Sequence, residues 1–342
     1  MSFQSVIFLQ LFFVYPILSF TGFKNAYMHS SSQKSLDQNG FFSPLLAEKL
    51  PWAQSVEASR ELTYMDMLKT QLDLIRKLKM EEVPLEDKFT YKTSDKKNAR
   101  MASLHFKNDR FRKVRMSYFD AGNSVQVFNS LWYPSYEYDS PLLGLDLISI
   151  GPSRVMSVCD FQPLHPTQEY STKHIEHLSP IREKYPDLHG TLSGKIYDDT
   201  SFFSKNMLFG RFTDESKIKP VVGPALEEYL NMYVKDVYAA TPNFDPKAMA
   251  VVRDRQRQYD VYNAEKDPAV GLFDAYFGKE WSQSFVHDFL FGLCNDGHVS
   301  KPVHSFELNM DGNVKFGETK SSHGEQATSK PLQQSRRIDV SV

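Results

Sequence analysis

The chain has 342 residues, a formal net charge of −2 and 24% charged residues, which is typical of one large globular domain, or two small ones, with tails. Its two cysteines, Cys159 and Cys294, cannot by themselves hold an iron–sulfur cluster or a structural zinc ion, and they imply no disulfide framework. The balanced charge gives no reason to expect a nucleic-acid partner. The 26 Phe and 17 Tyr residues suit a large flat ligand or an ordinary core.

The first fifty residues are predicted to be a targeting segment. Met1–Phe20 has no charged residue and carries an apolar run that resembles the core of a signal peptide. The following SFTGFKNAYMHSSSQKS is Ser-rich, weakly basic and free of acids until Asp37, which is typical of a transit peptide. Together they resemble the bipartite presequence of algae with secondary plastids. This predicts a plastid stromal protein without membrane attachment; simple secretion is the alternative.

Helical periodicity starts the remaining chain, and strand periodicity follows it. Apolar residues at three- and four-residue steps predict a helix over Ala53–Met80, and the charged Lys88–Arg100 is expected to be a loop or edge. Alternation then predicts five strands: Met101–Phe106, Arg112–Phe119, Asn123–Tyr133, Leu142–Ile150 and Arg154–Gln162. Their connections are too short for parallel crossovers, so neighbouring strands must be antiparallel.

Helices dominate the second half of the sequence. Their predicted ranges are Thr172–Tyr185, Pro224–Val237, Pro246–Ala264, Ala269–Phe277 and Glu280–Phe291, with irregular chain over Leu188–Phe212. Strands followed by helices indicate an α+β fold, an antiparallel sheet with helices on both faces. We expect one domain over residues 51–295 and an extension over 296–342 that is largely disordered after 320.

Two strands each contain a polar residue that needs an explanation. Asn129 lies in the third predicted strand and Asp146 in the middle of the strongly apolar fourth. If these strands pair, we expect the two side chains to lie near each other. A carboxylate among apolar residues carries a burial cost. A functional and a purely structural role for Asp146 stay equally open at this point, and Asn129 has the alternative of bonding a neighbouring backbone group.

The other ionisable residues in apolar context have simpler explanations. Asp267 precedes Pro268 at a helix junction, where a helix cap is the favoured interpretation. Asp160 ends a strand and has the option of bonding a turn. His174 and His177 lie three residues apart, but without a third ligand a solvated helix face is favoured over a metal site. The sequence contains no dinucleotide fingerprint, P-loop, CxxC, HExxH or GxSxG motif.

Several segments together resemble the ferredoxin-dependent bilin reductases. They are DAGNSVQVFNSLWYPSYEYDSPLLGLDLI, VCDFQPL, FFSKNMLFGRF and YDVYNAEKDPAVGLFDAYFGKEWSQSFVHDFLF, in the order and spacing of the family, from about Arg112 to Leu293. YDVYNAEKDPA and FVHDFLF are most similar to the members that reduce biliverdin IXα at the C15–C16 methine bridge to 15,16-dihydrobiliverdin. The alternatives are a sister reductase that forms phycoerythrobilin and a bilin carrier or lyase that does not reduce.

The resemblance implies a three-layer α/β/α sandwich with the bilin between the sheet and the C-terminal helices. It implies no bound metal or flavin: reduced ferredoxin supplies electrons singly, and the bilin holds the radical. Such a protein must supply protons, which is general-acid chemistry. We further expect a monomer that passes its product to the next bilin reductase.

The resemblance also implies roles for individual residues. Asp146 matches the central catalytic aspartate, Asp267 a second proton donor on the helix side, and Asn129 a residue that contacts or orients the bilin. Asn263 stands where members that reduce the A-ring diene often have Arg, which favours the single reduction. The segment containing Ser204 resembles the propionate-binding region.

Arginine provides two further expectations. Arg211, in the same segment as Ser204, suits a propionate because a guanidinium matches a carboxylate geometrically. Arg110, Arg112, Lys113 and Arg115 form a basic run before the central strands. This run suits docking of an acidic ferredoxin, although a solvated charged face is the favoured interpretation.

Overall fold

The computed structural model describes residues 62–151, 153–191, 202–267 and 269–295, together with the short strands 307–308 and 314–315. By its internal contacts the chain divides into two units, Met1–Asp296 and Gly297–Val342. The predicted presequence lies outside the described residues, as does the predicted disorder after residue 320. In the second unit, β9 (Glu307–Leu308) and β10 (Val314–Lys315) pair antiparallel.

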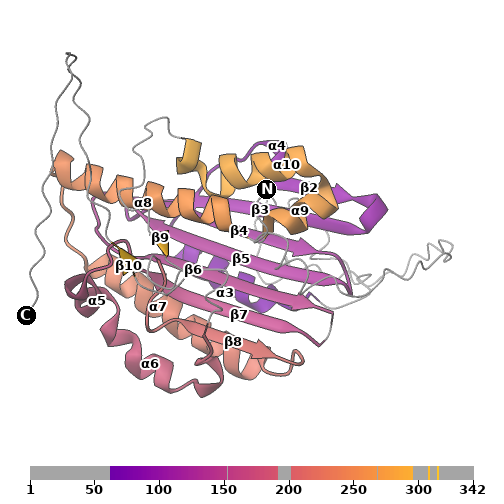
Figure 1. Ribbon diagram of the computed structural model, residues 1–342, viewed down its shortest axis with the longest axis horizontal. Helices are drawn as coiled ribbons and strands as arrows, with labels where there is room; N and C mark the ends of the chain where they lie inside the picture. Colours follow the sequence, from indigo (N-terminus) through magenta and orange to yellow (C-terminus); the bar gives the residue numbers. More distant parts are fainter. Residues whose placement is uncertain are drawn as a thin grey trace, which may run out of the picture. The chain divides into compact units, whose positions relative to one another are not determined.

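An eight-stranded antiparallel sheet forms the centre of the first unit (Figure 1). Its main path runs β1-β3-β4-β5-β6-β7-β8, and β2 also pairs with β3. The strands are β1 (Glu81–Glu82), β2 (Tyr91–Ser94), β3 (Ala99–Lys107), β4 (Phe111–Asp120), β5 (Val125–Pro134), β6 (Leu142–Ile150), β7 (Val155–Gln162) and β8 (Leu208–Phe212). The predicted antiparallel order of the five central strands is confirmed, because each pairs with its sequence neighbour.

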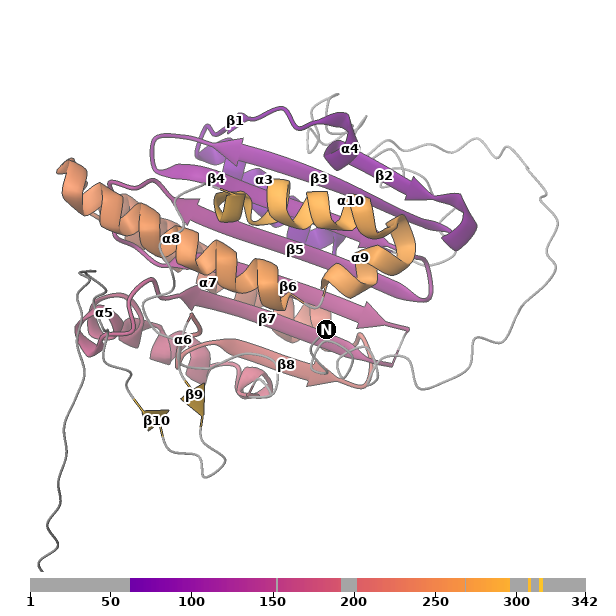
Figure 2. The same ribbon diagram turned by 45° about the horizontal axis from the view of Figure 1, so that its top comes forward.

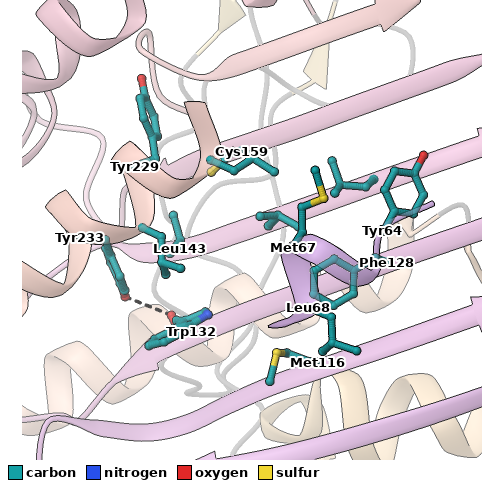
Figure 3. Packing of buried hydrophobic residues seen from close by; sticks show 14 of the residues in the cluster. Tyr64, Met67, Leu68, Met116, Phe128, Trp132, Leu143, Cys159, Tyr229 and Tyr233 are labelled. Carbon is teal, nitrogen blue, oxygen red and sulfur yellow. Dashed lines mark hydrogen bonds between the residues drawn. The ribbon is translucent and has the colours of Figure 1, made fainter. Parts of the chain in front are cut away.

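One face of the sheet is covered by α3 (Met65–Lys77) and α7 (Gly223–Ala239). Their apolar sides pack on alternate residues of the central strands, as Figure 3 shows for side chains such as Met67, Phe128 and Tyr233. Polar ends are satisfied inside this layer: Tyr233 Oη donates to the Trp132 carbonyl at 3.1 Å, and the Trp132 indole donates to Gln71 Oε1 at 3.0 Å. The result is one continuous core between sheet and helices.

The opposite face carries the C-terminal helices (Figure 2). They are α8 (Pro246–Lys266), α9 (Ala269–Phe277) and α10 (Lys279–Ser284), and α10 continues into a π-helical turn over Phe285–Leu290. Together with the short α4 (Asp87–Thr90) they pack an aromatic cluster against β3, β4 and β5. Helices on both faces of an antiparallel sheet confirm the predicted α+β sandwich.

The first helix is shorter than its periodicity predicts. α3 starts at Met65, and the predicted part over 53–61 lies outside the described residues. The amide groups of Thr63 and Tyr64 do not begin a helix, because they donate to side chains of the sheet. Their acceptors are Gln126 Oε1 at 3.0 Å and Tyr118 Oη at 3.2 Å. These sheet contacts fix the direction in which the chain enters the helix.

The helix predicted over Thr172–Tyr185 is wrong as a single element. The structure has α5 (Gln168–His174), a 3₁₀ turn at Glu176–Leu178 and α6 (Ser179–Glu183). The Ile175 carbonyl accepts from Asn206 Nδ2 at 2.7 Å and from the Leu178 amide at 3.1 Å, a 3₁₀ bond instead of an α-helical one. Pro180 lacks an amide hydrogen, so it favours the first turn of a new helix. Among the described residues, no helix is both long and apolar enough to cross a membrane.

Candidate active site

The two polar residues of the central strands lie directly opposite each other. β5 and β6 pair antiparallel, with Asn129 as the register partner of Asp146. Residues paired in this way share one face of the sheet. Asn129 Nδ2 donates a hydrogen bond to Asp146 Oδ1. The prediction that these side chains lie close together is therefore confirmed.

The Asp146 carboxyl group is enclosed by protein, although part of the residue remains exposed. Burial raises the pKa of Asp146 above its ordinary value of 3.8, because desolvation disfavours the ionised form. The hydrogen bond from Asn129 and the positive charge of Arg115 lower the pKa in part. The net direction is upward, which favours a carboxyl group that holds a proton.

A buried arginine completes this polar row. Arg115 on β4 is only 1% exposed, and its guanidinium donates to Asn129 Oδ1. Its Nε donates to the Leu290 carbonyl at 3.0 Å, at the end of the π-helical turn. Arg115, Asn129 and Asp146 therefore form a hydrogen-bonded chain across three adjacent strands. Strand alternation is the sequence signal that could have predicted this position of Arg115. Its neighbours Val114 and Met116 are core residues, so Arg115 lies on the opposite face of the strand.

The basic run is half-buried at Arg110, Arg112 and Lys113 and fully buried at Arg115. The two interpretations given to it, ferredoxin docking and a solvated face, are both wrong for Arg115, which is buried. Arg112 lies 4.3 Å from the ring centroid of Tyr133 and donates to Gln256 Oε1 at 2.6 Å. Burial lowers the pKa of Lys113 to about 7, and its ammonium donates to a carbonyl of the π-helical turn. The helices on this face therefore cover the charged residues of β4 in part.

Asp267 approaches the same region from the helix layer. It ends α8, and its Oδ1 accepts a hydrogen bond from the Ala269 amide at 2.8 Å. The cap interpretation is therefore confirmed. Burial raises the pKa of Asp267 to about 6, and the negative charge of Asp146 is the next contribution. The two carboxyl groups thus come within electrostatic range of each other from opposite layers.

A third carboxyl group is buried on the same face of the sheet. Asp160 on β7 is 0% exposed, and it accepts hydrogen bonds from the amide and the hydroxyl of Ser204. Burial raises the pKa of Asp160 to about 7, against the opposing effect of those bonds. Asp160 thus bonds a segment 44 residues later in the chain instead of the turn that follows its own strand, and the Ser204 hydroxyl, predicted to bind a propionate, here bonds Asp160.

A glycine next to Asp146 makes room for a polar contact. A Cβ atom on Gly144 would lie 2.5 Å from Gln162 Oε1, so the Gln162 amide lies over the strand where other residues carry a side chain. The same Oε1 accepts from Tyr259 Oη at 2.5 Å. Tyr259 belongs to α8, so this bond ties the helix layer to the sheet beside the carboxyl groups.

The sheet surface around Asp146 is only partly covered. Val127, Ile148 and Met156 lie on its face and are half-buried, whereas their strand neighbours Phe128 and Leu147 on the other face are 0% exposed. Apolar packing on the site face is divided into two clusters, one under the C-terminal helices and one around β8. Asp146 lies on the strand between them, beside apolar surface suited to a flat ligand.

Arg211 lies at the edge of this surface. It is exposed on β8, its register partner is Met156, and its guanidinium stacks 5.1 Å from the ring centroid of Phe209. Among the described residues no carboxylate forms an ion pair with Arg211, so its donors are available to an incoming anion. This position is compatible with binding a carboxylate of a ligand on the sheet.

Other features lie apart from this row of residues. A hollow of about 280 Å³ between α3 and α7 is on the opposite face, with Leu145 among its lining residues, and contains none of the predicted site residues. His177 bonds Asp236 at 2.7 Å, whereas His174 stacks on Tyr170. In the described part of the chain no three His, Cys, Asp or Glu side chains cluster as metal ligands.

The arrangement is suited to proton delivery at an apolar surface. It combines a carboxyl group with a raised pKa, an amide fixed beside it, a second carboxyl group from the helix layer and an arginine at the edge. Such a site can hold a flat conjugated molecule and transfer protons to it.

Comparisons with known proteins agree with this chemistry. The family model described as ferredoxin-dependent bilin reductase matches residues 68–292. The chain is 42% identical over 203 residues to the 15,16-dihydrobiliverdin:ferredoxin oxidoreductase of Nostoc punctiforme, covering 59% of this chain and 83% of the relative. It is 41% identical over 180 residues to the protein of that name from Gloeobacter violaceus, covering 53% and 73%.

A solved structure supports the fold independently. The selenomethionine form of tomato phytochromobilin synthase in complex with biliverdin superposes with a TM-score of 0.63 at 20% identity, covering 73% of this chain and 91% of that one. At this identity the likeness concerns the fold alone. The family match spans most of the described sheet and all of the carboxyl groups above. The chain therefore belongs to the ferredoxin-dependent bilin reductase family.

Proposed function

We propose that this protein uses electrons from ferredoxin to reduce biliverdin IXα at the C15–C16 methine bridge, giving 15,16-dihydrobiliverdin. The observation that carries the proposal is the hydrogen-bonded pair of Asn129 and Asp146 on a partly open sheet face, within a chain about 40% identical to reductases of that name. The net reaction adds two electrons and two protons. One new C–H bond forms at each end of the reduced double bond.

Asp146 is the proposed first proton donor. Its raised pKa keeps the neutral acid available in the site, and general acids of this kind contribute strongly when they touch the reacting group. A protonated bilin is a better electron acceptor, because positive charge stabilises the added electron. Proton transfer from Asp146 therefore assists electron transfer from ferredoxin. Electrons that arrive singly would pass through bilin radicals, which electron paramagnetic resonance can detect during turnover.

Asp267 is the proposed second donor. Its pKa, raised to about 6, and its electrostatic interaction with Asp146 support this role. Asn129 is proposed to hold the bilin and Asp146 in register. Asn263 is buried, and its amide donates to the Tyr259 carbonyl at 2.9 Å, so no cation stands there for a second reduction. This supports a reaction that stops at the dihydro stage.

Arg211 and Ser204 are the proposed contacts of the propionate groups. Arg211 has the stronger support, since it is exposed at the edge of the half-buried apolar surface. The Ser204 hydroxyl donates to Asp160 and accepts from the Asn206 amide at 3.2 Å, so a propionate would have to share it.

Anaerobic turnover decides between the candidate activities. Purified protein, biliverdin IXα, ferredoxin and a ferredoxin-reducing system are expected to accumulate a dihydrobiliverdin with blue-shifted absorption, identified by chromatography against authentic standards. Conversion onward to phycoerythrobilin would replace the proposal by the sister activity. Tight biliverdin binding without consumption of electrons would instead indicate a carrier or lyase.

Replacing the proposed acid provides the sharpest mutational test. Asp146→Asn is expected to lower the reduction rate by roughly 100- to 10 000-fold, because the amide has no acidic proton to donate. Biliverdin binding, measured by the absorbance of the complex, should be retained, since the side chain keeps its shape. Asp109→Asn on the exposed surface is the matched control and should reduce biliverdin normally. Normal turnover by Asp146→Asn would remove Asp146 from the mechanism.

The remaining expectations concern the cellular setting. We propose a plastid stromal enzyme whose presequence, within residues 1–50, is removed on import, and which holds neither metal nor flavin. We also propose a monomer that transfers its product to the next reductase. Metal and flavin analysis of the purified protein, light scattering, import into isolated plastids and pull-down with a phycoerythrobilin-forming reductase test these points separately.

A further inference from the structure

Arg115 is an unusual buried cation. It is 1% exposed, yet among the residues the structure describes no carboxylate forms a salt bridge with it. Its hydrogen-bond partners are neutral oxygens, namely the Leu290 carbonyl and Asn129 Oδ1. Its guanidinium also lies 5.2 Å from the ring centroid of Phe291. A buried charge without a direct salt bridge is costly, which indicates that Arg115 has a role beyond packing.

The chemistry of the guanidinium determines the orientation of Asn129. Arginine donates hydrogen bonds and cannot accept them. The end of the Asn129 amide that faces Arg115 must therefore be the oxygen, and the NH₂ end must face Asp146. A flipped amide would place two donors against each other. Arg115 thus selects one of the two amide orientations that an isolated asparagine could adopt.

The orientation of the Asn129 amide determines which oxygen of Asp146 can carry the proton. Because Asp146 Oδ1 accepts from the Asn129 NH₂ group, a proton on the Asp146 carboxyl group belongs on Oδ2. We propose that Arg115 is a positioning residue: it locks the Asn129 amide, so that the transferable proton of Asp146 is confined to Oδ2. This inference rests on the proposed function, because it concerns how the acid of that reaction is prepared.

The charged and titratable groups around Asp146 come from both layers. Arg115 approaches from β4, and Asp267 and Tyr259 approach from the helix layer, where the charge of Asp146 contributes to raising the pKa of each. Cys159 lies on the adjacent strand and also senses Asp146. Of these groups, Arg115 alone bonds Asn129 in the described structure. The other groups can affect the charge of Asp146 but do not fix its hydrogen-bond partner.

A double-mutant cycle tests the chain of contacts. Arg115→Met and Asn129→Leu are each expected to lower kcat for biliverdin reduction by roughly 10- to 100-fold, as misplacement of a reacting group does. The KM for biliverdin should change little in Arg115→Met, whereas Asn129→Leu also loses the proposed contact with the bilin. If Arg115 acts through Asn129, the double variant should be no slower than the slower single variant. Losses that multiply would overturn the proposal.

The pH profile tests whether Arg115 acts on the Asp146 carboxyl group. Removing the positive charge of Arg115 favours the protonated form of Asp146, so the alkaline limb of the kcat profile of Arg115→Met should move to higher pH. The double-mutant cycle then decides whether Arg115 acts through Asn129. An unshifted limb contradicts the proposal.

Controls keep the test decisive. Arg154→Met removes an exposed arginine that lies outside the basic run and does not bond the Asn129–Asp146 pair, and it should leave kcat within about twofold of the wild type. If Arg115→Met does not fold, judged by thermal unfolding, Arg115→Gln takes its place in the cycle, because an amide can both donate and accept and so does not fix the orientation of Asn129. If the wild type fails to reduce biliverdin, the proposed function is wrong. If the wild type is active but the kcat losses of the two single variants multiply in the double variant, only the role of Arg115 is wrong.

Discussion

The two faces of the central sheet are built on different principles. The face under α3 and α7 has one continuous apolar core, in which alternate residues such as Phe128 and Leu147 are fully buried. The face under α8–α10 contains half-buried apolar residues and buried ionisable groups, among them Arg115 and Asp160. Both faces belong to the same strands, so the difference is set by single alternating positions.

The difference indicates a division of labour between stability and chemistry. Buried ionisable groups carry a desolvation cost that a purely structural core would avoid. On the α8–α10 face this cost is seen as raised pKa values of Asp146, Asp160, Asp260 and Asp267. The continuous core on the other face offsets it. A sheet with one stabilising face can hold a face that is not optimised for stability.

The comparison predicts that neighbouring residues respond differently to truncation. Phe128→Ala should lower the free energy of unfolding by about 3–5 kcal/mol, because it leaves a cavity in the continuous core. Val127→Ala, one residue earlier on the other face, should cost about 1 kcal/mol or less, because Val127 is already half-exposed. Urea unfolding measures both.

The same two substitutions should affect biliverdin binding in the opposite order. Val127→Ala should weaken biliverdin binding, whereas the folded fraction of Phe128→Ala should bind normally. If Val127→Ala proved as destabilising as Phe128→Ala, the α8–α10 face would be a closed core and the division between the two faces would be wrong.

The buried acids predict how stability depends on pH. The pKa of Asp160 is about 7 in the folded protein against an ordinary 3.8, so the folded state keeps this proton longer than the unfolded state. Stability from this group is full below about pH 4 and falls as pH rises toward about 7. Asp160→Asn should reduce the loss of unfolding free energy between these values by about 1–3 kcal/mol.

Denaturant unfolding at several pH values checks this expectation. The asparagine can accept from the Ser204 amide and donate to its hydroxyl, so the contact itself is preserved. Some pH dependence should remain, because Asp146 and Asp267 also have raised pKa values. A variant with the full pH dependence of the wild type would show that Asp160 ionises without cost.

Local patterns were sufficient to predict the five central strands and the central polar pair, although not β1, β2 and β8. Alternation gave the strands, and short connections required antiparallel neighbours, so Asn129 and Asp146 were expected to be close before any register was known. Asp267 was expected as a cap from its position at a helix junction. Each of these inferences depends on residues that are neighbours in sequence or on adjacent strands.

Contacts between distant segments could not be predicted in this way. Arg115 looks like a surface charge until the π-helical turn after α10 is placed over it, where Leu290 lies 175 residues later in the chain. Asp160 gains its partner Ser204 from a segment 44 residues away. At the break after α5, the Ile175 carbonyl accepts from Asn206, which lies 31 residues later in the chain. Burial of a polar group is decided by the element that covers it, and local sequence does not specify that element.

The smallest expected effect separates the two roles of Asp267. Its Oδ1 accepts from the Ala269 amide, and asparagine can make the same cap. Asp267→Ala should therefore lower the free energy of unfolding by about 1 kcal/mol, and Asp267→Asn by only a few tenths. Thermal unfolding of the two variants measures this difference.

Turnover of the same variants shows whether the helix layer contributes chemistry. A proton donor is lost in both, so biliverdin reduction should fall by roughly tenfold or more in Asp267→Asn as well as in Asp267→Ala. A pure cap would instead leave Asp267→Asn as active as the wild type. The first outcome places an acid on each side of the substrate. The second would confine proton donation to the sheet, with the helix layer serving only to cover it.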